Sequence, residues 1–251
     1  MGDSLKGKIY FASDFHLGAP DLAASHERER RIVRWMDSIK KDCQELFLVG
    51  DLFDAWFEYK QVVPKGFTRL LGKISEFSDA GIPVHIFSGN HDVWMFGYLD
   101  DECGAKIYHE PVRREWNGKK FIIGHGDGLG PGEGWYKFMK GGFRNKILQW
   151  MYSRFHPNLG LWFAKSISRN GYDKKEDQLK YKGDEKEFLV LYCKSVLEKE
   201  HIDYFVFGHR HLPLDKEVGK NSHYINLGDW ILNNTFGVFD GEKLELQSFE
   251  K

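Results

Sequence analysis

Disulfide chemistry, membrane-spanning runs and a dominant charge are all missing from this 251-residue sequence. The three cysteines, Cys43, Cys103 and Cys193, lie far apart and form no Cys-x-x-Cys pair, which argues against a disulfide framework and for a reducing compartment. The sequence contains no run of roughly 18–20 apolar residues, the length that crosses a bilayer, and its N-terminus lacks the apolar core of a signal peptide. We therefore expect a cytoplasmic protein that is still able to associate with a membrane surface.

No global charge bias points to a polyanionic partner. Lys and Arg total 36 and Asp and Glu total 37, a formal net charge of −1, so composition gives no reason to expect nucleic-acid binding. Hydrophobic residues make up 41% and charged residues 29% of the chain, which is typical of a globular protein with a full core. Repeats, low-complexity tracts and linkers rich in Pro, Gly or Ser are also missing.

Apolar strand-like segments alternate with helical patterns in the first half of the chain. We expect strands at Lys8–Ser13, Glu45–Val49 and Val84–Ser88. Helices are expected between them, across approximately Glu27–Lys41 and Phe67–Ala80. Such alternation predicts a sheet that begins parallel and is built from right-handed crossovers.

The remaining strand patterns are of the hairpin type. A strand is expected at Tyr204–Phe207, followed by turns near Gly219–Asn221 and Asp240-Gly241, and Val112–Gly124 is an earlier hairpin that turns at Asn117-Gly118. The combination predicts an α/β (α+β) fold of two packed mixed β-sheets flanked by helices. Residues 1–133 and 198–251 are expected to form this core, and residues 134–197 a helical cap inserted into it.

Short polar motifs follow five of the apolar segments, and four of these motifs begin with glycine, which suits a sharp turn or a close backbone approach. They are Asp14-Phe15-His16, Gly50-Asp51-Leu52-Phe53-Asp54, Gly89-Asn90-His91-Asp92, Gly124-His125-Gly126-Asp127 and Gly208-His209-Arg210-His211. Because ligands bind beyond the carboxyl ends of strands in open α/β sheets, we expect the five loops to gather their side chains around one point.

Imidazole, carboxylate and amide groups together suit Mn²⁺, Zn²⁺, Fe²⁺ or Co²⁺ better than Ca²⁺ alone. A carboxylate can bridge two ions, so Asp51 is the expected bridge. The other expected ligands are Asp14, His16 and His211 for one ion and Asn90, His125 and His209 for the second. Two ions about 3.5–4 Å apart polarise phosphoryl oxygens and activate a water for in-line attack on phosphorus.

Taken singly, each motif has an ordinary explanation. An aspartate after a strand often caps a helix, a lone histidine is more often a core residue than a ligand, and Asn90 suits a plain turn. Five such motifs at strand ends favour a shared centre instead. The other histidines lack spaced partners and are expected in surface or packing roles; they are His26, His85, His109, His156, His201 and His223.

The order of the motifs (Asp-x-His, Gly-Asp-x-x-Asp, Gly-Asn-His-Asp, Gly-His and Gly-His-x-His) resembles that of the calcineurin-like metallophosphoesterases, across residues 14–211. The resemblance implies a two-sheet β-sandwich flanked by helices and a metal-dependent phosphoesterase.

A closer resemblance is to the UDP-2,3-diacylglucosamine hydrolases of the lipid A pathway, and it covers nearly the whole chain. The similar blocks are Ala12–Leu17, Leu48–Trp56, His125–Asp127, Tyr136–Phe138, Gly208–Pro213 and Leu227–Trp230. The resemblance implies hydrolysis of the pyrophosphate in UDP-2,3-diacylglucosamine to UMP and the diacylated sugar 1-phosphate, usually with Mn²⁺. It also implies a bacterial protein on the cytoplasmic face of the inner membrane.

One position departs from that closer family, whose best-known members carry Arg where this chain has His91. Histidine is the choice of the wider superfamily, where a neighbouring acid holds it; here that acid is expected to be Asp92. Such a histidine stabilises the transition state or protonates the leaving oxygen, so Asn90, His91 and Asp92 are the expected catalytic residues. The departure leaves open a soluble phosphodiesterase or phosphatase acting on a nucleotide or phosphoprotein. A non-catalytic scaffold is disfavoured because every ligand position is filled.

The helical block concentrates basic and aromatic residues: between Gly134 and Tyr172 the sequence has no Asp or Glu. Its basic residues are Lys137, Lys140, Arg144, Lys146, Arg154, Lys165 and Arg169, and its aromatic residues are Trp135, Tyr136, Phe138, Phe143, Trp150, Tyr152, Phe155, Trp162, Phe163 and Tyr172. One interpretation is a pair of amphipathic helices with aromatics in a core. We favour a cap that holds acyl chains and presents a basic rim to a pyrophosphate or an anionic membrane. The residues expected to contact substrate are Asn90, His91, Glu133, Arg169, Asn170, Lys174, Lys175 and His209.

Overall fold

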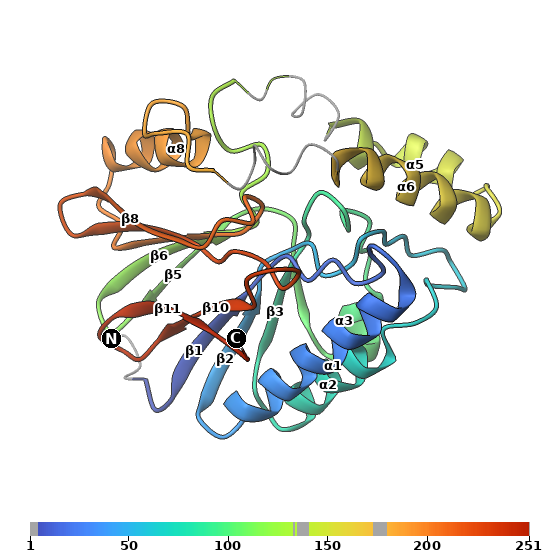
Figure 1. Cartoon of the computed structure of the whole chain (residues 1–251), viewed down its shortest axis with the longest axis horizontal. Coiled ribbons are helices and arrows are strands. Elements are labelled where there is room, and N and C mark those ends of the chain that lie inside the picture. The colour runs from blue at the N-terminus through green and yellow to red at the C-terminus, as the bar shows by residue number, and fades with distance from the viewer. Residues whose placement is uncertain (1–4, 133, 135–140, 173–179, 251) are drawn as a thin grey trace.

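The computed structural model describes residues 5–132, 134, 141–172 and 180–250, with the backbone alone at 167 and 169–172. In these ranges the strands form two sheets (Figure 1). The first has the order β11-β10-β1-β2-β3-β4. Its strands are β1 (Lys8–Ala12), β2 (Cys43–Leu48), β3 (Val84–Phe87), β4 (Lys106–Tyr108), β10 (Thr235–Phe239) and β11 (Leu244–Ser248). Strands β1 to β4 are parallel, and β10 runs antiparallel to both β1 and β11.

The second sheet has the order β5-β6-β7-β9-β8. Its strands are β5 (Val112–Trp116), β6 (Lys119–Gly124), β7 (Tyr204–Phe207), β8 (Leu214–Gly219) and β9 (Ser222–Asn226). Strands β6, β7 and β9 are parallel, while β5 and β8 close the edges as antiparallel hairpin partners. The three predicted hairpins are confirmed, and both sheets are mixed, as the sequence predicted.

Helices cover the outer faces of the two sheets. The described helices are α1 (Leu22–Ile39), α2 (Thr68–Asp79), α3 (Tyr98–Cys103), α5 (Lys146–Tyr152), α6 (Pro157–Tyr172) and α8 (Phe188–Leu197). Helices α1, α2 and α3 lie against the first sheet, α8 lies against the second, and α5 and α6 lie apart at one end (Figure 1). Helix α1 begins before the predicted Glu27 because the Asp21 side chain accepts a hydrogen bond from Ala24 N at 2.9 Å and caps the first turn. The sequence analysis missed α3 and β4.

The central strands, such as β1, β3 and β7, are buried on both faces because helices cover each sheet on one side and the other sheet covers it on the second side. In β1, Ile9 and Phe11 face the second sheet, where they join a core with Phe121 and Val206. The alternate residue Tyr10 belongs to the core beneath α1 and α2. A third core lies between the second sheet and α8. Four layers, helix, sheet, sheet and helix, therefore enclose three apolar cores.

Residues 134–197, predicted to be a cap, divide into two kinds of structure. Helix α8 packs as a core helix, with Leu189, Val190 and Cys193 buried against the second sheet. Helix α5 has no buried residue and lies on the surface. Whether the whole range forms one inserted unit stays a prediction.

Aromatic contacts attach α5 to the core. Tyr152 packs on Phe57 and Trp94 at ring-centroid distances of 4.7 Å and 4.6 Å, and Phe143 packs on Trp94 at 5.5 Å. The other described aromatics of this block, Trp150, Phe155, Trp162 and Phe163, are exposed. Trp135, Tyr136 and Phe138 lie outside the described residues, and only the backbone of Tyr172 is described.

Phe11 gives a test of the core between the sheets. It is fully buried and stacks on Phe47 and Phe121. We expect Phe11→Ala to lower the free energy of unfolding by about 3–5 kcal/mol, because it leaves a cavity that the two sheets cannot close. Leu22→Ala, which alters a side chain that is 67% exposed, is the control and should change stability little. A loss under 1 kcal/mol for Phe11→Ala in urea denaturation would contradict this packing.

Candidate metal centre

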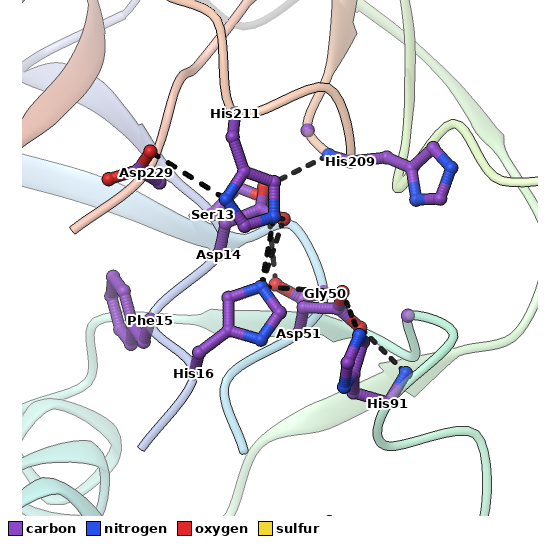
Figure 2. A network of polar contacts seen from close by, with 12 residues as sticks. Ser13, Asp14, Phe15, His16, Gly50, Asp51, His91, His209, His211 and Asp229 are labelled. Carbon is purple, nitrogen blue, oxygen red and sulfur yellow. Dashed lines mark hydrogen bonds and ion pairs between the residues drawn. The ribbon is translucent and has the colours of Figure 1, made fainter. Parts of the chain in front are cut away.

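The five polar loops meet at one edge of the two-sheet sandwich. Strands β1, β2 and β3 are parallel in the first sheet, and β6 and β7 are parallel in the second, so the loops that follow them leave from shared edges. Figure 2 shows the side chains of Asp14, His16, Asp51 and His211 turned toward one another. All seven predicted metal ligands lie in this cluster.

Asp14, His16 and His211 form the first group. Asp14 Oδ1 lies 3.2 Å from His211 Nε2 and 3.6 Å from His16 Nε2. The two imidazole Nε2 atoms are 3.1 Å apart. Asp14 Oδ1 is buried and accepts no hydrogen bond from any described residue. A buried carboxylate oxygen aimed at two imidazoles is a geometry that suits a shared cation.

Asp51 lies between this group and the second. Its Oδ2 is 3.6 Å from His16 Nε2 and 3.3 Å from His125 Nε2. Its Oδ1 accepts a hydrogen bond from the backbone N of His91 at 2.9 Å, which fixes the carboxylate. This central place fits the bridging position that the sequence predicted.

The second group is formed by Asn90, His125 and His209. Asn90 Oδ1 lies 2.9 Å from His209 Nδ1 and 3.3 Å from His125 Nε2. His125 Nδ1 donates to Val49 O at 2.9 Å, so in the neutral ring Nε2 carries a lone pair. That lone pair faces the oxygens of Asn90 and Asp51. Acceptors that face acceptors require a positive charge among them, which a proton or a metal ion supplies.

Four of the expected ligands have the protonation state that metal binding needs, whereas His125 would have to lose a proton: burial lowers its pKa, but the Asp51 carboxylate outweighs this effect and raises the pKa well above the usual range. Burial alone would raise the pKa of Asp14 and Asp51, but the surrounding histidines hold both pKa values below the ordinary range. Burial lowers the pKa of His16 and of His209 to about 4, so both rings are neutral at neutral pH. Ionised carboxylates and neutral imidazoles are the forms that bind cations.

Strained backbone holds several of these side chains in place. Asp14, His16, Asp51, His209 and His211 all have positive φ, between 43° and 68°. Such conformations cost on the order of 1–3 kcal/mol each in non-glycine residues and occur where the surrounding structure enforces them. Five of the seven expected ligands share this feature, so the loops are constrained to aim side chains at a common point.

Glycines allow the loops to approach one another. A Cβ at Gly50 would lie 2.5 Å from His125 Nδ1, and one at Gly208 would lie 2.5 Å from Asp14 Oδ2. A Cβ at Gly89 would lie 2.6 Å from the backbone N of Asp51. The predicted close backbone approach is confirmed at these positions.

The predicted pairing of His91 with Asp92 is wrong. Asp92 is fully buried and points away from His91, accepting hydrogen bonds from Leu52 N and Gly89 N at 2.7 Å each. It therefore stabilises the two loops that carry Asp51 and Asn90. His91 Nδ1 instead lies 3.2 Å from the carbonyl oxygen of Asp54 and 3.5 Å from its carboxylate. Burial lowers the pKa of His91, but the charges of Asp51 and Asp54 outweigh this effect and raise it to about 9.

Other side chains that the sequence analysis missed support the loops from behind. Arg28 of α1 donates to the carbonyl oxygens of Phe15, His16 and Ala19 at 3.1, 2.8 and 3.1 Å. Arg210 is held by a buried ion pair with Glu187 at 2.8 Å, and Asp229 lies 3.6 Å from His211 Nδ1. Arg28 and Glu187 belong to no motif, whereas Arg210, Asp229 and Asp54 lie in the blocks Gly208–Pro213, Leu227–Trp230 and Leu48–Trp56 and could have been found there.

The structure describes the side chains of three of the eight residues predicted to contact substrate. Asn90, His91 and His209 lie in the cluster described above. Glu133, Lys174 and Lys175 lie outside the described residues, and Arg169 and Asn170 are described by their backbone in α6 only.

Comparison with known proteins agrees with this geometry. A family model described as calcineurin-like phosphoesterase matches residues 7–213. The chain belongs to the calcineurin-like phosphoesterase family. The family predicted from the motifs is therefore confirmed, and membership makes this phosphoesterase a metal-dependent hydrolase whose clustered aspartates and histidines suit divalent cations.

Curated relatives of this phosphoesterase carry a more specific name. A UDP-2,3-diacylglucosamine hydrolase from Porphyromonas gingivalis is 38% identical to it, over 98% of this chain and 99% of the relative. Proteins of the same name from Actinobacillus succinogenes and Vibrio parahaemolyticus are 25% and 24% identical, over 89% and 95% of this chain and 92% and 96% of those relatives. The predicted closer resemblance is thus also confirmed.

Gly89→Ala tests whether the close approach of the loops is required. The added methyl would collide with the backbone and carboxylate of Asp51 and displace this central group. We expect phosphodiesterase activity with Mn²⁺ to fall at least about tenfold, since displacement of a positioned group by 1 Å can cost 100-fold. Gly72→Ala is the control. Gly72 lies inside α2, and a Cβ there would meet no atom outside the backbone of the helix within 4 Å, so the change should stabilise the chain by about 0.5–1 kcal/mol. Full activity in Gly89→Ala would show that the approach is not needed.

Proposed function

We propose that this phosphoesterase hydrolyses the pyrophosphate bond of UDP-2,3-diacylglucosamine, giving UMP and 2,3-diacylglucosamine 1-phosphate. The observation that carries the phosphoesterase chemistry is the convergence of six other nitrogen and oxygen ligands around the Asp51 carboxylate. The substrate is inferred from the relative of that name that is 38% identical over nearly the full length of both chains.

We further propose that the cluster binds two divalent cations, with Mn²⁺ as the native ion. Asp51 would bridge them, as a carboxylate placed between two ligand groups can. One ion would be held by Asp14, His16 and His211, and the other by Asn90, His125 and His209. Bound cations supply charge to the phosphoryl oxygens and lower the pKa of a bound water.

His91 is proposed to contribute a hydrogen-bond donor. Its Nδ1 faces acceptor atoms of Asp54, and its Nε2 lies 4.0 Å from Asp51 Oδ2, on the side of the proposed ions. A protonated ring in this orientation can donate from Nε2 to a phosphoryl oxygen or to the leaving oxygen. Asp92 would support the loops and not the reaction itself.

We propose that the face formed by α5 and α6 binds the acyl chains of the substrate and contacts the membrane. Large apolar side chains are exposed on these two helices and on the turn between them, among them Trp150 at 58% and Trp162 at 65%. They are Ile147, Leu148, Trp150, Met151, Phe155, Leu159, Trp162 and Phe163. Arg154 lies 4.8 Å from the ring of Trp150, so basic and aromatic groups are interleaved as at a lipid interface. Within the described ranges, no helix has the length and apolar character needed to span a bilayer.

Asp51→Asn tests the proposed bridge. The amide keeps the shape of the carboxylate and the hydrogen bond to His91 N but removes the charge between the two ligand groups. We expect turnover of bis(p-nitrophenyl) phosphate to fall by about 100-fold or more, and the rise in melting temperature on addition of Mn²⁺ to shrink, because bound ligand stabilises the folded state. Asp37→Asn, at an exposed carboxylate of α1, is the control. Wild-type turnover in Asp51→Asn would contradict the assignment.

The substrate is tested by comparing UDP-2,3-diacylglucosamine, UDP-N-acetylglucosamine and bis(p-nitrophenyl) phosphate with Mn²⁺ present. We expect the diacylated substrate to have the highest kcat/KM. Trp150→Ala and Phe155→Ala should lower that value about tenfold, since burying an aromatic side chain contributes about 1.5–3 kcal/mol, and should leave the small diester unaffected.

Leu22→Ala, which alters an exposed apolar side chain outside α5 and α6, serves as the control for these two variants. Cleavage of the small diester alone would reject the lipid substrate and favour a phosphodiesterase of small molecules. Equal losses on all three substrates would mean that the aromatics support packing instead of lipid binding.

A further inference from the structure

Among the side chains of α6 that the structure describes, the buried Ser168 reaches the candidate metal centre. Its hydroxyl oxygen lies 2.6 Å from Asp54 Oδ1 and 3.1 Å from His91 Nδ1. Ser168 is 114 positions from Asp54 in the sequence and is 8% exposed. Ser166, two residues earlier on the same helix, only donates to Trp162 O within α6 at 2.8 Å.

The chemistry of the atoms sets the direction of these hydrogen bonds. The Asp54 carbonyl oxygen can only accept, and it lies 3.2 Å from His91 Nδ1, so Nδ1 carries a proton. The Ser168 hydroxyl donates to the Asp54 carboxylate, which leaves its oxygen free to accept from His91 Nδ1. A chain of hydrogen bonds therefore runs from the His91 ring through Ser168 to Asp54.

The carbonyl oxygen of Asp54 contacts the ring directly, but its carboxylate is farther away. The direct distance from His91 Nδ1 to Asp54 Oδ1 is 3.5 Å, beyond the usual range for an N–H···O hydrogen bond. Ser168 bridges this gap with two shorter contacts. Because a histidine ring turns about its Cβ–Cγ bond, fixing Nδ1 also fixes where Nε2 points, which is toward Asp51.

We propose that Ser168 is a positioning residue that links His91 to Asp54 and aims His91 Nε2 at the reacting phosphoryl group. This role makes the helical block a part of the reactive centre as well as a surface for substrate. It rests on the proposed phosphoesterase chemistry of His91. The competing interpretation is that Ser168 only fastens α6 to the core, in which case its hydroxyl would affect stability and not turnover.

Ser168→Thr and Ser168→Val separate the two interpretations, because the two side chains have nearly the same shape and differ in the hydroxyl. Both are prepared in the full-length chain with Mn²⁺ and assayed on bis(p-nitrophenyl) phosphate, with Ser166→Ala as a control on the same helix. We expect the valine variant to have a kcat about 10- to 100-fold below that of the threonine variant, the range for losing a hydrogen bond to an ionised group. KM and Mn²⁺ affinity by calorimetry should be alike in the two variants.

The same pair is then made in a His91→Gln background, where no imidazole remains to be aimed. There we expect the threonine and valine variants to have equal kcat. Equal kcat in the original background, or a valine loss that persists in full in the His91→Gln background, would overturn the role of Ser168. A wild-type chain that cleaves no phosphoester would instead contradict the proposed function.

Discussion

The Asp51 carboxylate is the constraint on which the centre depends. It is almost fully buried and lies within 4.0 Å of imidazole nitrogens from three other loops, on His16, His91 and His125. A buried carboxylate is costly unless positive charge or hydrogen-bond donors surround it. Each of the surrounding loops must therefore place its side chain next to the Asp51 carboxylate. This requirement limits the length and the path of the crossover connections.

Rigid layers of secondary structure offset the free-energy cost of holding the loops in this arrangement. The parallel strands β1, β2 and β3 are buried on both faces, by the second sheet and by α1 and α2. Such packing can hold the left-handed backbone of Asp14, His16 and Asp51, which an isolated loop would relax. The hydrogen bonds from Arg28 to three carbonyl oxygens of the first loop also hold this loop in its conformation.

The helices of the 134–197 range contribute to both the core and the centre. Helix α8 covers the second sheet, and its N-cap residue Glu187 holds Arg210 between two of the expected ligands. Helix α6 combines the buried Ser168 near His91 with exposed apolar side chains such as Trp162. Ser168 and Trp162 lie less than two turns apart, so this one helix carries both a side chain at the candidate metal centre and part of the exposed apolar face.

The sequence by itself determined most of the strands, the hairpins, the family and the residues that gather in the cluster, because these depend on local patterns. A short apolar run between turn residues makes a buried strand recognisable, and a polar motif directly after a parallel strand is expected at the edge of the sheet where ligands bind. Elements with weak local signals were missed, as the short β4 and α3 show.

Only the tertiary structure decided which side chains meet. His91 and Asp92 are adjacent in sequence, yet they point to different sides of their loop, and the partner of His91 is Asp54 from another loop. Ser168 arrives from a helix more than a hundred positions away from Asp54. Partners of this kind depend on where the chain returns after a long crossover, and that path is set by the packing of whole layers, which no short stretch of sequence encodes.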